Sequence, residues 1–195
     1  EKTADVRYSF TLLERTNNGS VVRVQTDNTD QPFDINEGSK LELGSTAKLR
    51  VLATYLEIIA ELHQRHAEQS ASELRAVNAQ DNLTRWAIAY LLSTPNASLP
   101  AMLDAALERK YSASPHERFF TGGGVHTFTN FRREDNARIA SMRQALRESL
   151  NLPFIRLMRD VVRYTTYQGP HNSAELLKDD KDPRRQAYLQ DFADR

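Results

Sequence analysis

The chain of 195 residues opens with a hydrophobic pattern that is typical of paired strands. Residues 8–14 and 21–25 are rich in β-branched and aromatic side chains. Between them lies Thr-Asn-Asn-Gly-Ser, residues 16–20, which is a strong turn signal, so the pattern predicts a β-hairpin within residues 1–30. Residues 27–43 are polar, contain glycines and have no sustained period, which predicts a loop.

From residue 45 onwards apolar residues recur mostly at helical spacing. The first such run predicts a long helix that begins near Ser45 and ends near Gln69, with an apolar face made of Leu49, Leu52, Ala53, Leu56 and Ile59. Five further helices are predicted from their caps and apolar faces. The first is capped by Asp81 or Asn82 and stops at Pro95, and the second is capped by Ser98 and ends at Leu107. The others cover 136–150, with Ile139 on the apolar face, then 154–164 after an interruption at Pro153, and a last segment opened by Asp182 and Pro183.

Residues 111–130 have no helical period and are predicted to form a long connection. They hold several phenylalanines and three consecutive glycines, residues 122–124. Long loops inside a compact domain are commonly functional or disordered, and the density of aromatic side chains here argues against disorder. The predicted fold class is therefore α+β, mostly helical, with a β-hairpin at the N-terminal end.

A serine and a lysine three residues apart stand where the predicted loop gives way to the first helix. The sequence there is Gly-Ser-Thr-Ala-Lys, residues 44–48. Residues three apart on a helix share a face, so we expect the Ser45 hydroxyl to meet the Lys48 amine. Burial and the positive end of the helix dipole both disfavour a protonated lysine, and a neutral amine can take the serine proton. The pair is a candidate nucleophile and base; its simpler interpretation is a helix start with a solvated lysine.

A second serine, Ser149, stands two residues before Asn151 at the break between two predicted helices, next to Pro153. In an irregular turn, two such side chains can point into the same cleft and exchange hydrogen bonds. A lone Ser-x-Asn is also an ordinary helix end. Together with the upstream Ser-x-x-Lys, however, it supplies two of the three motifs that occur together in one known family of enzymes.

With these two motifs the sequence resembles the penicillin-binding transpeptidases and their serine β-lactamase relatives, whose motif set is Ser-x-x-Lys, Ser-x-Asn and Lys-Thr-Gly. Residues 33–36 (Phe-Asp-Ile-Asn) and 44–48 resemble the approach to the nucleophile in the bifunctional, high-molecular-mass enzymes. Residues 124–131 and 145–153 resemble their approach to the second motif. The resemblance covers most of residues 6–165.

This resemblance implies a D,D-transpeptidase that cross-links peptidoglycan without a metal or other cofactor. Ser45 would attack the carbonyl of a D-Ala-D-Ala bond, and Lys48 would act as the base or set the protonation of the serine. Ser149 would relay a proton to the leaving amine, and Asn151 would hold the substrate amide and orient Lys48. The implied partners are stem peptides and β-lactams, which acylate the same serine. The implied location is periplasmic or otherwise extracytoplasmic, on the bacterial inner membrane, with any membrane anchor outside these residues.

Two features depart from the family pattern. Leu49 follows the motif lysine where many members have a proline, and no Lys-Thr-Gly occurs in the sequence. In the family that third motif lies on a sheet strand that supplies an oxyanion donor and an edge for the substrate. We therefore expect residues 1–195 to form a single incomplete transpeptidase domain, with the hairpin in 1–30 and a mainly helical part in 45–195, nearly inactive alone. A hairpin without sheet partners is expected to pair with another chain, as in a homodimer, or to be poorly ordered.

Composition narrows the partners and the compartment only in part. Lys plus Arg and Asp plus Glu each number 26, and this zero net charge argues against a dominant nucleic-acid or anionic-membrane partner. There is no cysteine, which excludes disulfides and cysteine-based zinc or thiol sites. No apolar run reaches the roughly 18 residues needed to cross a bilayer. The chain begins with Glu1 rather than Met, so we expect a piece of a longer protein.

Other candidate sites have simpler interpretations. His63 and His66 stand three apart on the first helix, but zinc wants three or four ligands, so a surface pair is the favoured interpretation. The three glycines favour close packing or mobility beside the cleft rather than phosphate binding. Trp86 is most simply a core residue, and Arg132 with its neighbour Arg133 is most simply a solvated face.

Two rival functions stay open. A β-lactamase or a β-lactam sensor shares the family, but the sequence offers no recognisable carboxylate for deacylation. A helical interaction module is the rival from another class, in which Ser45 and Lys48 merely begin a helix. Exchange of Ser45 for alanine separates them, because an interaction module would keep its partner binding.

Overall fold

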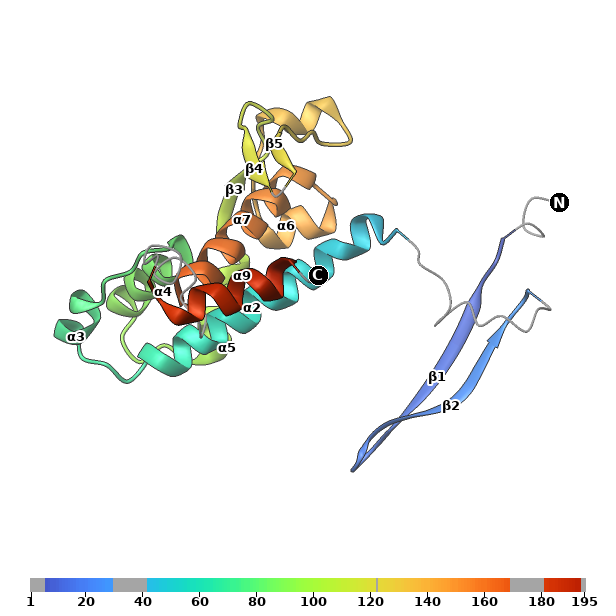
Figure 1. Cartoon of the computed structure of the whole chain (residues 1–195), viewed down its shortest axis with the longest axis horizontal. Helices are drawn as coiled ribbons and strands as arrows, with labels where there is room; N and C mark the ends of the chain where they lie inside the picture. Colours follow the sequence, from blue (N-terminus) through green and yellow to red (C-terminus); the bar gives the residue numbers. More distant parts are fainter. Residues whose placement is uncertain (1–5, 30–41, 122, 169–180, 194–195) are drawn as a thin grey trace. The chain divides into compact units, whose positions relative to one another are not determined.

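The computed structural model describes residues 6–29, 42–121, 123–168 and 181–193 (Figure 1). The chain divides into two compact units, residues 1–44 and 45–195. The fold is α+β, as predicted: helices dominate, and the described strands form two-stranded antiparallel sheets. Residues 33–36, Gly122 and most of the predicted loop over 27–43 lie outside the described residues.

The first unit contains the predicted hairpin, β1 (Ser9–Thr16) and β2 (Gly19–Asp27). Thr16 pairs with Gly19, which leaves a two-residue turn, and Gly19 adopts φ +122°, a region that favours glycine. The register shifts by a bulge between Leu12 and Leu13. Apolar side chains on both strands are exposed, so the hairpin by itself buries little surface.

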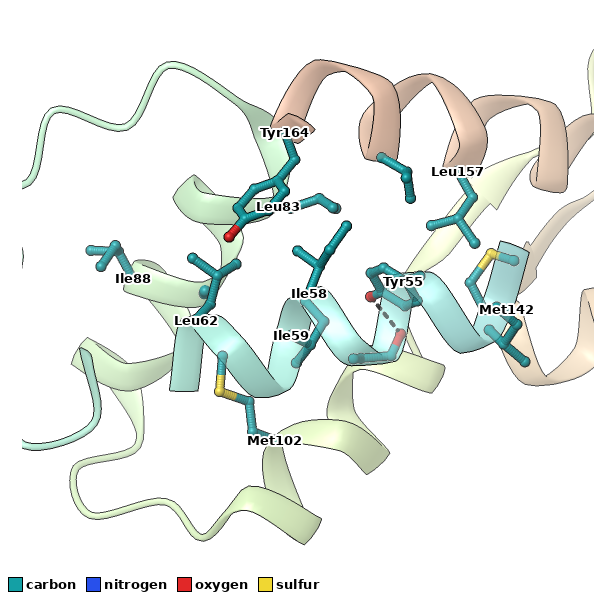
Figure 2. Close-up of a cluster of buried hydrophobic side chains, with 14 of the residues drawn as sticks. Tyr55, Ile58, Ile59, Leu62, Leu83, Ile88, Met102, Met142, Leu157 and Tyr164 are labelled. Carbon is teal, nitrogen blue, oxygen red and sulfur yellow. Dashed lines mark hydrogen bonds between the residues drawn. The ribbon is translucent and has the colours of Figure 1, made fainter. Parts of the chain in front are cut away.

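The second unit is organised around α2 (Ala47–His66), which follows a short 3-10 turn, η2 (Gly44–Thr46). Figure 2 shows its buried side chains between Met102 on one side and residues of two other helices on the other. Tyr55, Ile59 and Leu62 are fully buried, and the Tyr55 hydroxyl donates to the Ala106 carbonyl at 3.0 Å. Of the predicted apolar face, Leu52 and Ile59 are buried, and Leu56 packs partly buried against the core.

The sequence placed two features of this helix wrongly. Leu49, which is 63 % exposed, and Ala53, which is also exposed, are not part of the apolar face, because the buried positions begin at Leu52 and continue at Tyr55. The helix ends at His66 rather than near Gln69. Ser70 then starts α3 (Ala71–Ala76), a helix that was not predicted, through a capping box in which its hydroxyl and the Glu73 carboxylate each accept from the other's backbone N–H.

The helices predicted from their caps are observed. Asp81 caps α4 (Asn82–Ser93) by accepting from the N–H groups of Leu83 and Thr84, both at 2.9 Å, and Ser98 caps α5 (Leu99–Leu107). The last helix, α9 (Pro183–Ala193), begins after Asp182 as expected, and the Asp182 carboxylate accepts from the Arg184 N–H at 2.9 Å.

The connection over 111–130 contains short strands that its lack of a long period concealed. Beside it, β3 (Lys110–Ser112) pairs with β6 (Ile139–Ser141), and β4 (Phe119–Thr121) pairs with β5 (Gly124–His126). Three-residue strands are too short to show a period of two, which is why the sequence did not predict them. Such short strands are stable only when paired with a partner strand.

The helix predicted over 136–150 is observed only over Met142–Arg147, and its first part is wrong. The segment forms a 3-10 turn, η3 (Arg133–Ala137), then β6 and then a short helix, α6 (Met142–Arg147). Ile139, assigned to an apolar helix face, is 68 % exposed on β6. Pairing with β3 overrides the local helical spacing here, since tertiary contacts outweigh propensity in so short a segment.

Pro153 does not interrupt a helix either. It is the third residue of α7 (Asn151–Gln168), which runs on beyond it. The first N–H groups of a helix have no partner within the helix, so proline costs little there. The chain breaks instead at Ser149, which has φ +55°.

A buried polar cluster joins four segments of the second unit. The Asp160 carboxylate on α7 is 3 % exposed and accepts from the Asn82 amide and the Tyr111 hydroxyl, each at 2.9 Å. The Arg109 guanidinium lies 3.7 Å from the same carboxylate and 5.6 Å from the centre of the Tyr55 ring. The partners of Asp160 come from α4, from β3 and from Arg109 in the link between α5 and β3, so the cluster ties these segments to α7.

Within the described residues, no helix has both the length and the apolar character that crossing a bilayer requires.

Leu62 and Leu49 offer a matched test of this packing, since both lie on α2 and only Leu62 is buried. We expect Leu62→Ala to lower the free energy of unfolding by about 2–5 kcal/mol, because it removes buried surface and leaves a cavity. Leu49→Ala should cost less than about 0.5 kcal/mol. Urea unfolding followed by fluorescence of Trp86, the only tryptophan and a partly buried neighbour of the core, measures both. Equal losses would contradict this placement of the core.

Candidate functional site

Ser45 and Lys48 meet as the spacing predicts. Ser45 lies in the 3-10 turn that leads into α2, and Lys48 lies in the first turn of that helix. Gly44 adopts φ +51°, a left-handed conformation that favours glycine, at the first residue of this 3-10 turn. The Lys48 Nζ atom lies 3.2 Å from Ser45 Oγ, which is within hydrogen-bond distance.

The second motif joins the same cluster from more than a hundred residues away. Lys48 Nζ lies 3.0 Å from Ser149 Oγ, 2.7 Å from the Ser149 carbonyl oxygen and 2.7 Å from Asn151 Oδ1. Ser149 Oγ also donates to Ser45 Oγ at 3.1 Å. The four residues predicted from sequence therefore form one hydrogen-bonded group, with the lysine amine at its centre.

Ser149 reaches the amine because it closes a helix. The N–H of Ser149 donates to the Leu146 carbonyl at 3.2 Å, and the N–H of Leu150 donates to the Ala145 carbonyl at 2.9 Å. These two bonds, with a left-handed residue at the position after the cap and a buried contact behind it, define a Schellman motif at the end of α6. Glycine usually takes the left-handed position, so a serine there carries a backbone cost of about 1–2 kcal/mol.

Asn151 is held on its other side by the connection before η3. Its Nδ2 donates to the Thr129 carbonyl at 3.0 Å, which turns its Oδ1 toward Lys48. The neighbouring Asn130 accepts the Leu152 N–H at 3.1 Å and donates to the Ala113 carbonyl at 2.8 Å. Sequence analysis missed Asn130 as a support of the site. Asparagine is common in loops and nothing in its neighbourhood marks its partners, so the sequence alone carries no signal for it.

Burial sets the electrostatics of Lys48. Removal from water disfavours the charged form and lowers the pKa of the Lys48 amine. Among the described residues no carboxylate lies within ion-pair distance of it, so no acidic partner opposes this shift. The two shortest contacts are to carbonyl oxygens, which only accept. A neutral amine can give both its N–H groups to them and keep its lone pair for a hydroxyl proton.

A cleft of about 520 Å³ opens beside this group. Ser45, Ser149 and Asn151 line it, together with a mostly charged set: Phe131, Arg132, Asp135, Arg138, Arg147, Glu148 and Leu150. A hydroxyl that contacts a lysine amine of lowered pKa, at the edge of a cleft, is the arrangement that nucleophilic catalysis requires.

The other candidates of the sequence lie elsewhere. His63 and His66 are not the expected surface pair, because His66 is buried and His63 is half-buried. A ring nitrogen of His63 contacts the Ala97 carbonyl at 2.7 Å, and His66 contacts the Gln69 side chain at 2.7 Å. In the part of the chain that the structure describes, no group of three or more His, Asp or Glu side chains is arranged to hold a metal ion. Trp86 is partly buried, stacks on Tyr90 and packs against the core.

Comparison of the chain with protein-family models, with curated proteins and with solved structures found no match in any of the three.

The lowered pKa of Lys48 makes a prediction for stability. Between the folded pKa and the unfolded value of about 10.4, the unfolded chain binds more protons, so the free energy of unfolding contributed by Lys48 rises with pH. Below the folded pKa the full cost of burying the charge remains. We therefore expect wild type to gain stability relative to Lys48→Met as pH rises from 7 toward 10. Urea unfolding across that range measures it, with Lys110→Met, which removes an exposed lysine, as the control. A parallel pH profile for wild type and Lys48→Met would contradict the shift.

The left-handed backbone of Ser149 makes a second prediction. Ser149→Gly relieves the backbone cost while Ser149→Ala retains it, and both variants lose the hydroxyl. We expect the glycine variant to be more stable than the alanine variant by about 1 kcal/mol. The comparison uses thermal or urea unfolding of the two variants. An alanine variant of equal or greater stability would show that the left-handed conformation costs nothing here.

Proposed function

We propose that this chain carries the acylation site of a serine acyl-transferase, specifically of a penicillin-binding D,D-transpeptidase that cross-links peptidoglycan. One observation carries the proposal: Ser45 Oγ, Lys48 Nζ and Ser149 Oγ lie in mutual contact, at 3.2, 3.0 and 3.1 Å. The motif resemblance supplies the substrate class, D-Ala-D-Ala stem peptides, and the periplasmic or extracytoplasmic location.

The contacts support a two-step reaction. Ser45 Oγ attacks the carbonyl carbon of the scissile amide as its proton passes to the neutral Lys48 amine, giving a tetrahedral intermediate. When the carbon–nitrogen bond breaks, a proton passes from Lys48 through Ser149 Oγ to the departing amine, and Ser45 remains as an ester. An amine from a second stem peptide then attacks that ester and releases Ser45 with its proton restored. The triangle of polar atoms supports the proton transfers among Ser45, Lys48 and Ser149, because each of these spans one hydrogen bond.

Asn151 supports the same assignment. Its Nδ2 contact to the Thr129 carbonyl keeps Oδ1 toward Lys48 and holds the amine beside Ser45. Asn151 also lines the cleft, where its amide can contact the peptide of the substrate.

The charges in the cleft favour a long-lived acyl-enzyme over a β-lactamase. Rapid deacylation needs a carboxylate that is free to activate water. The acidic residues lining the cleft are Asp135 and Glu148, and Arg138 contacts both, at 2.8 and 2.5 Å. Both carboxylates are held in ion pairs with Arg138, so neither is free to activate water.

Labelling with benzylpenicillin tests the proposal on the chain itself. Opening of the lactam ring by Ser45 adds the whole mass of the drug, which intact mass spectrometry detects, and peptide mapping locates the adduct. We expect labelling at Ser45 that is slow, by about 10²–10³ relative to a complete site, since these residues hold no Lys-Thr-Gly motif and so only part of an oxyanion hole. Ser45→Ala should abolish the adduct. Ser93→Ala, which removes another serine at a helix end, should leave it unchanged.

Other outcomes would each exclude something definite. No adduct after prolonged exposure to millimolar drug would overturn the acyl-transferase proposal and favour the helical interaction module. An adduct that disappears within minutes of drug removal would favour a β-lactamase. Labelling as fast as that of an intact penicillin-binding enzyme would contradict the expected weakness of the partial site.

A further inference from the structure

The cleft beside Ser45 has an unequal charge balance. Its lining includes three arginines and two acids: Arg132, Arg138, Arg147, Asp135 and Glu148. The chain as a whole is neutral, so this lining departs from the average surface. The sequence favoured a plain solvated face for Arg132, whereas the structure puts it at the cleft.

Both acids of the cleft are engaged by one arginine. Arg138 contacts the Asp135 carboxylate at 2.8 Å through Nη1 and the Glu148 carboxylate at 2.5 Å through Nη2. Gln144 Nε2 donates to the same glutamate at 2.9 Å. Hydrogen bonds from Gln144 and then Arg138 lower the pKa of the Glu148 carboxyl, which keeps it charged and paired.

The other two arginines are not neutralised in this way. Arg132 lies 4.0 Å from Glu134, at the outer limit of an ion pair, and both side chains are more than two thirds exposed, so the contact is weak. Arg147 makes no ion pair within 4.0 Å with any described residue, and its interaction with the neighbouring Glu148 is a longer-range attraction. Two guanidinium groups in the cleft therefore keep donors for a ligand.

We propose that this part of the cleft is a subsite for a carboxylate, carried by a side chain of the peptide that is processed at Ser45. Guanidinium groups suit this ligand because their planar N–H donors match the two oxygens of a carboxylate. The subsite rests on the proposed function for its peptide substrate, and it adds a charge preference that the Ser-x-x-Lys and Ser-x-Asn motifs do not specify. Arg147 and Arg132 are its specificity-determining residues.

Equilibrium binding to the Ser45→Ala chain tests this without turnover. The probes are two peptides ending in D-Ala-D-Ala that differ at one side chain, a glutamate in one and a glutamine in the other. Their terminal carboxylates are the same, so any difference in affinity reports the side-chain charge. NMR titration should show the acidic peptide binding about two- to five-fold tighter at low salt, as expected for partly exposed charge pairs. Higher salt should reduce the difference.

Substitution of the arginines then assigns the preference. Arg147→Ala should remove most of it, and adding Arg132→Ala should abolish it. Arg163→Ala is the matched control, since it removes one exposed positive charge from α7 away from the cleft and should preserve the preference. Arg147 is exposed, so its variant should keep the native fold, which Trp86 fluorescence checks. Free acetate at the same concentration should not compete, because it lacks the peptide contacts.

The results separate the subsite from the proposed function. Equal affinity for the two peptides, a preference that survives the double arginine variant, or no binding of either peptide at millimolar concentration would overturn the subsite. Labelling of Ser45 by benzylpenicillin together with equal affinities would leave the acyl-transferase proposal standing alone. A charge preference without labelling would retain the anion subsite and reject acyl transfer.

Discussion

The candidate site depends on one amine. Lys48 Nζ contacts the Ser45 hydroxyl, in the 3-10 turn before its own helix, and three oxygen atoms of Ser149 and Asn151, at the junction of α6 and α7. These contacts join two parts of the chain that lie far apart in the sequence. The amine is partly withdrawn from water, so its charge is costly, and the oxygens around it offset that cost whichever protonation state it adopts. The same four contacts thus position the chemical groups and link the two helices that carry them.

The turn that receives Lys48 carries strain of its own. A serine in the left-handed position of a Schellman motif puts both a hydroxyl and a carbonyl oxygen on the amine, and the hydroxyl is what glycine cannot supply. Asn130 holds the next turn from outside by taking the Leu152 N–H. Strain tolerated where surrounding bonds enforce it is a feature of functional sites. Here the enforcing bonds come from the backbone of α6 and from the connection before η3.

Sequence reasoning succeeded where the signal is local or strongly periodic. The turn before Gly19, the caps at Asp81 and Ser98, and the apolar face of α2 each depend on residues close in sequence. Ser45 and Lys48 were expected to meet because of their spacing on a helix, whereas their meeting with Ser149 and Asn151 was expected only through the resemblance.

Sequence reasoning failed where distant partners decide the conformation. Ile139 has helical spacing but pairs with β3 in a sheet, and Pro153 is harmless because it falls in the first turn of α7. The Asp160 cluster and the support from Asn130 join residues 22 or more positions apart, so no local pattern announces them.

The separation of 101 to 103 residues between Lys48 and its partners also bears on the order of folding. Closing a loop of that length costs an entropy that grows with the logarithm of the loop length. This entropy is lost before the contacts that the closed loop permits can stabilise the chain. The intervening helices α4 and α5 pack on α2 after closing much shorter loops. Their packing reduces the entropy cost, because less free chain then separates Lys48 from Ser149. The site is therefore expected to assemble late, after the hydrophobic faces have joined. During synthesis the full site cannot exist before Asn151 has left the ribosome, so Lys48 gains its contacts with Ser149 and Asn151 only after the helices between them have been made.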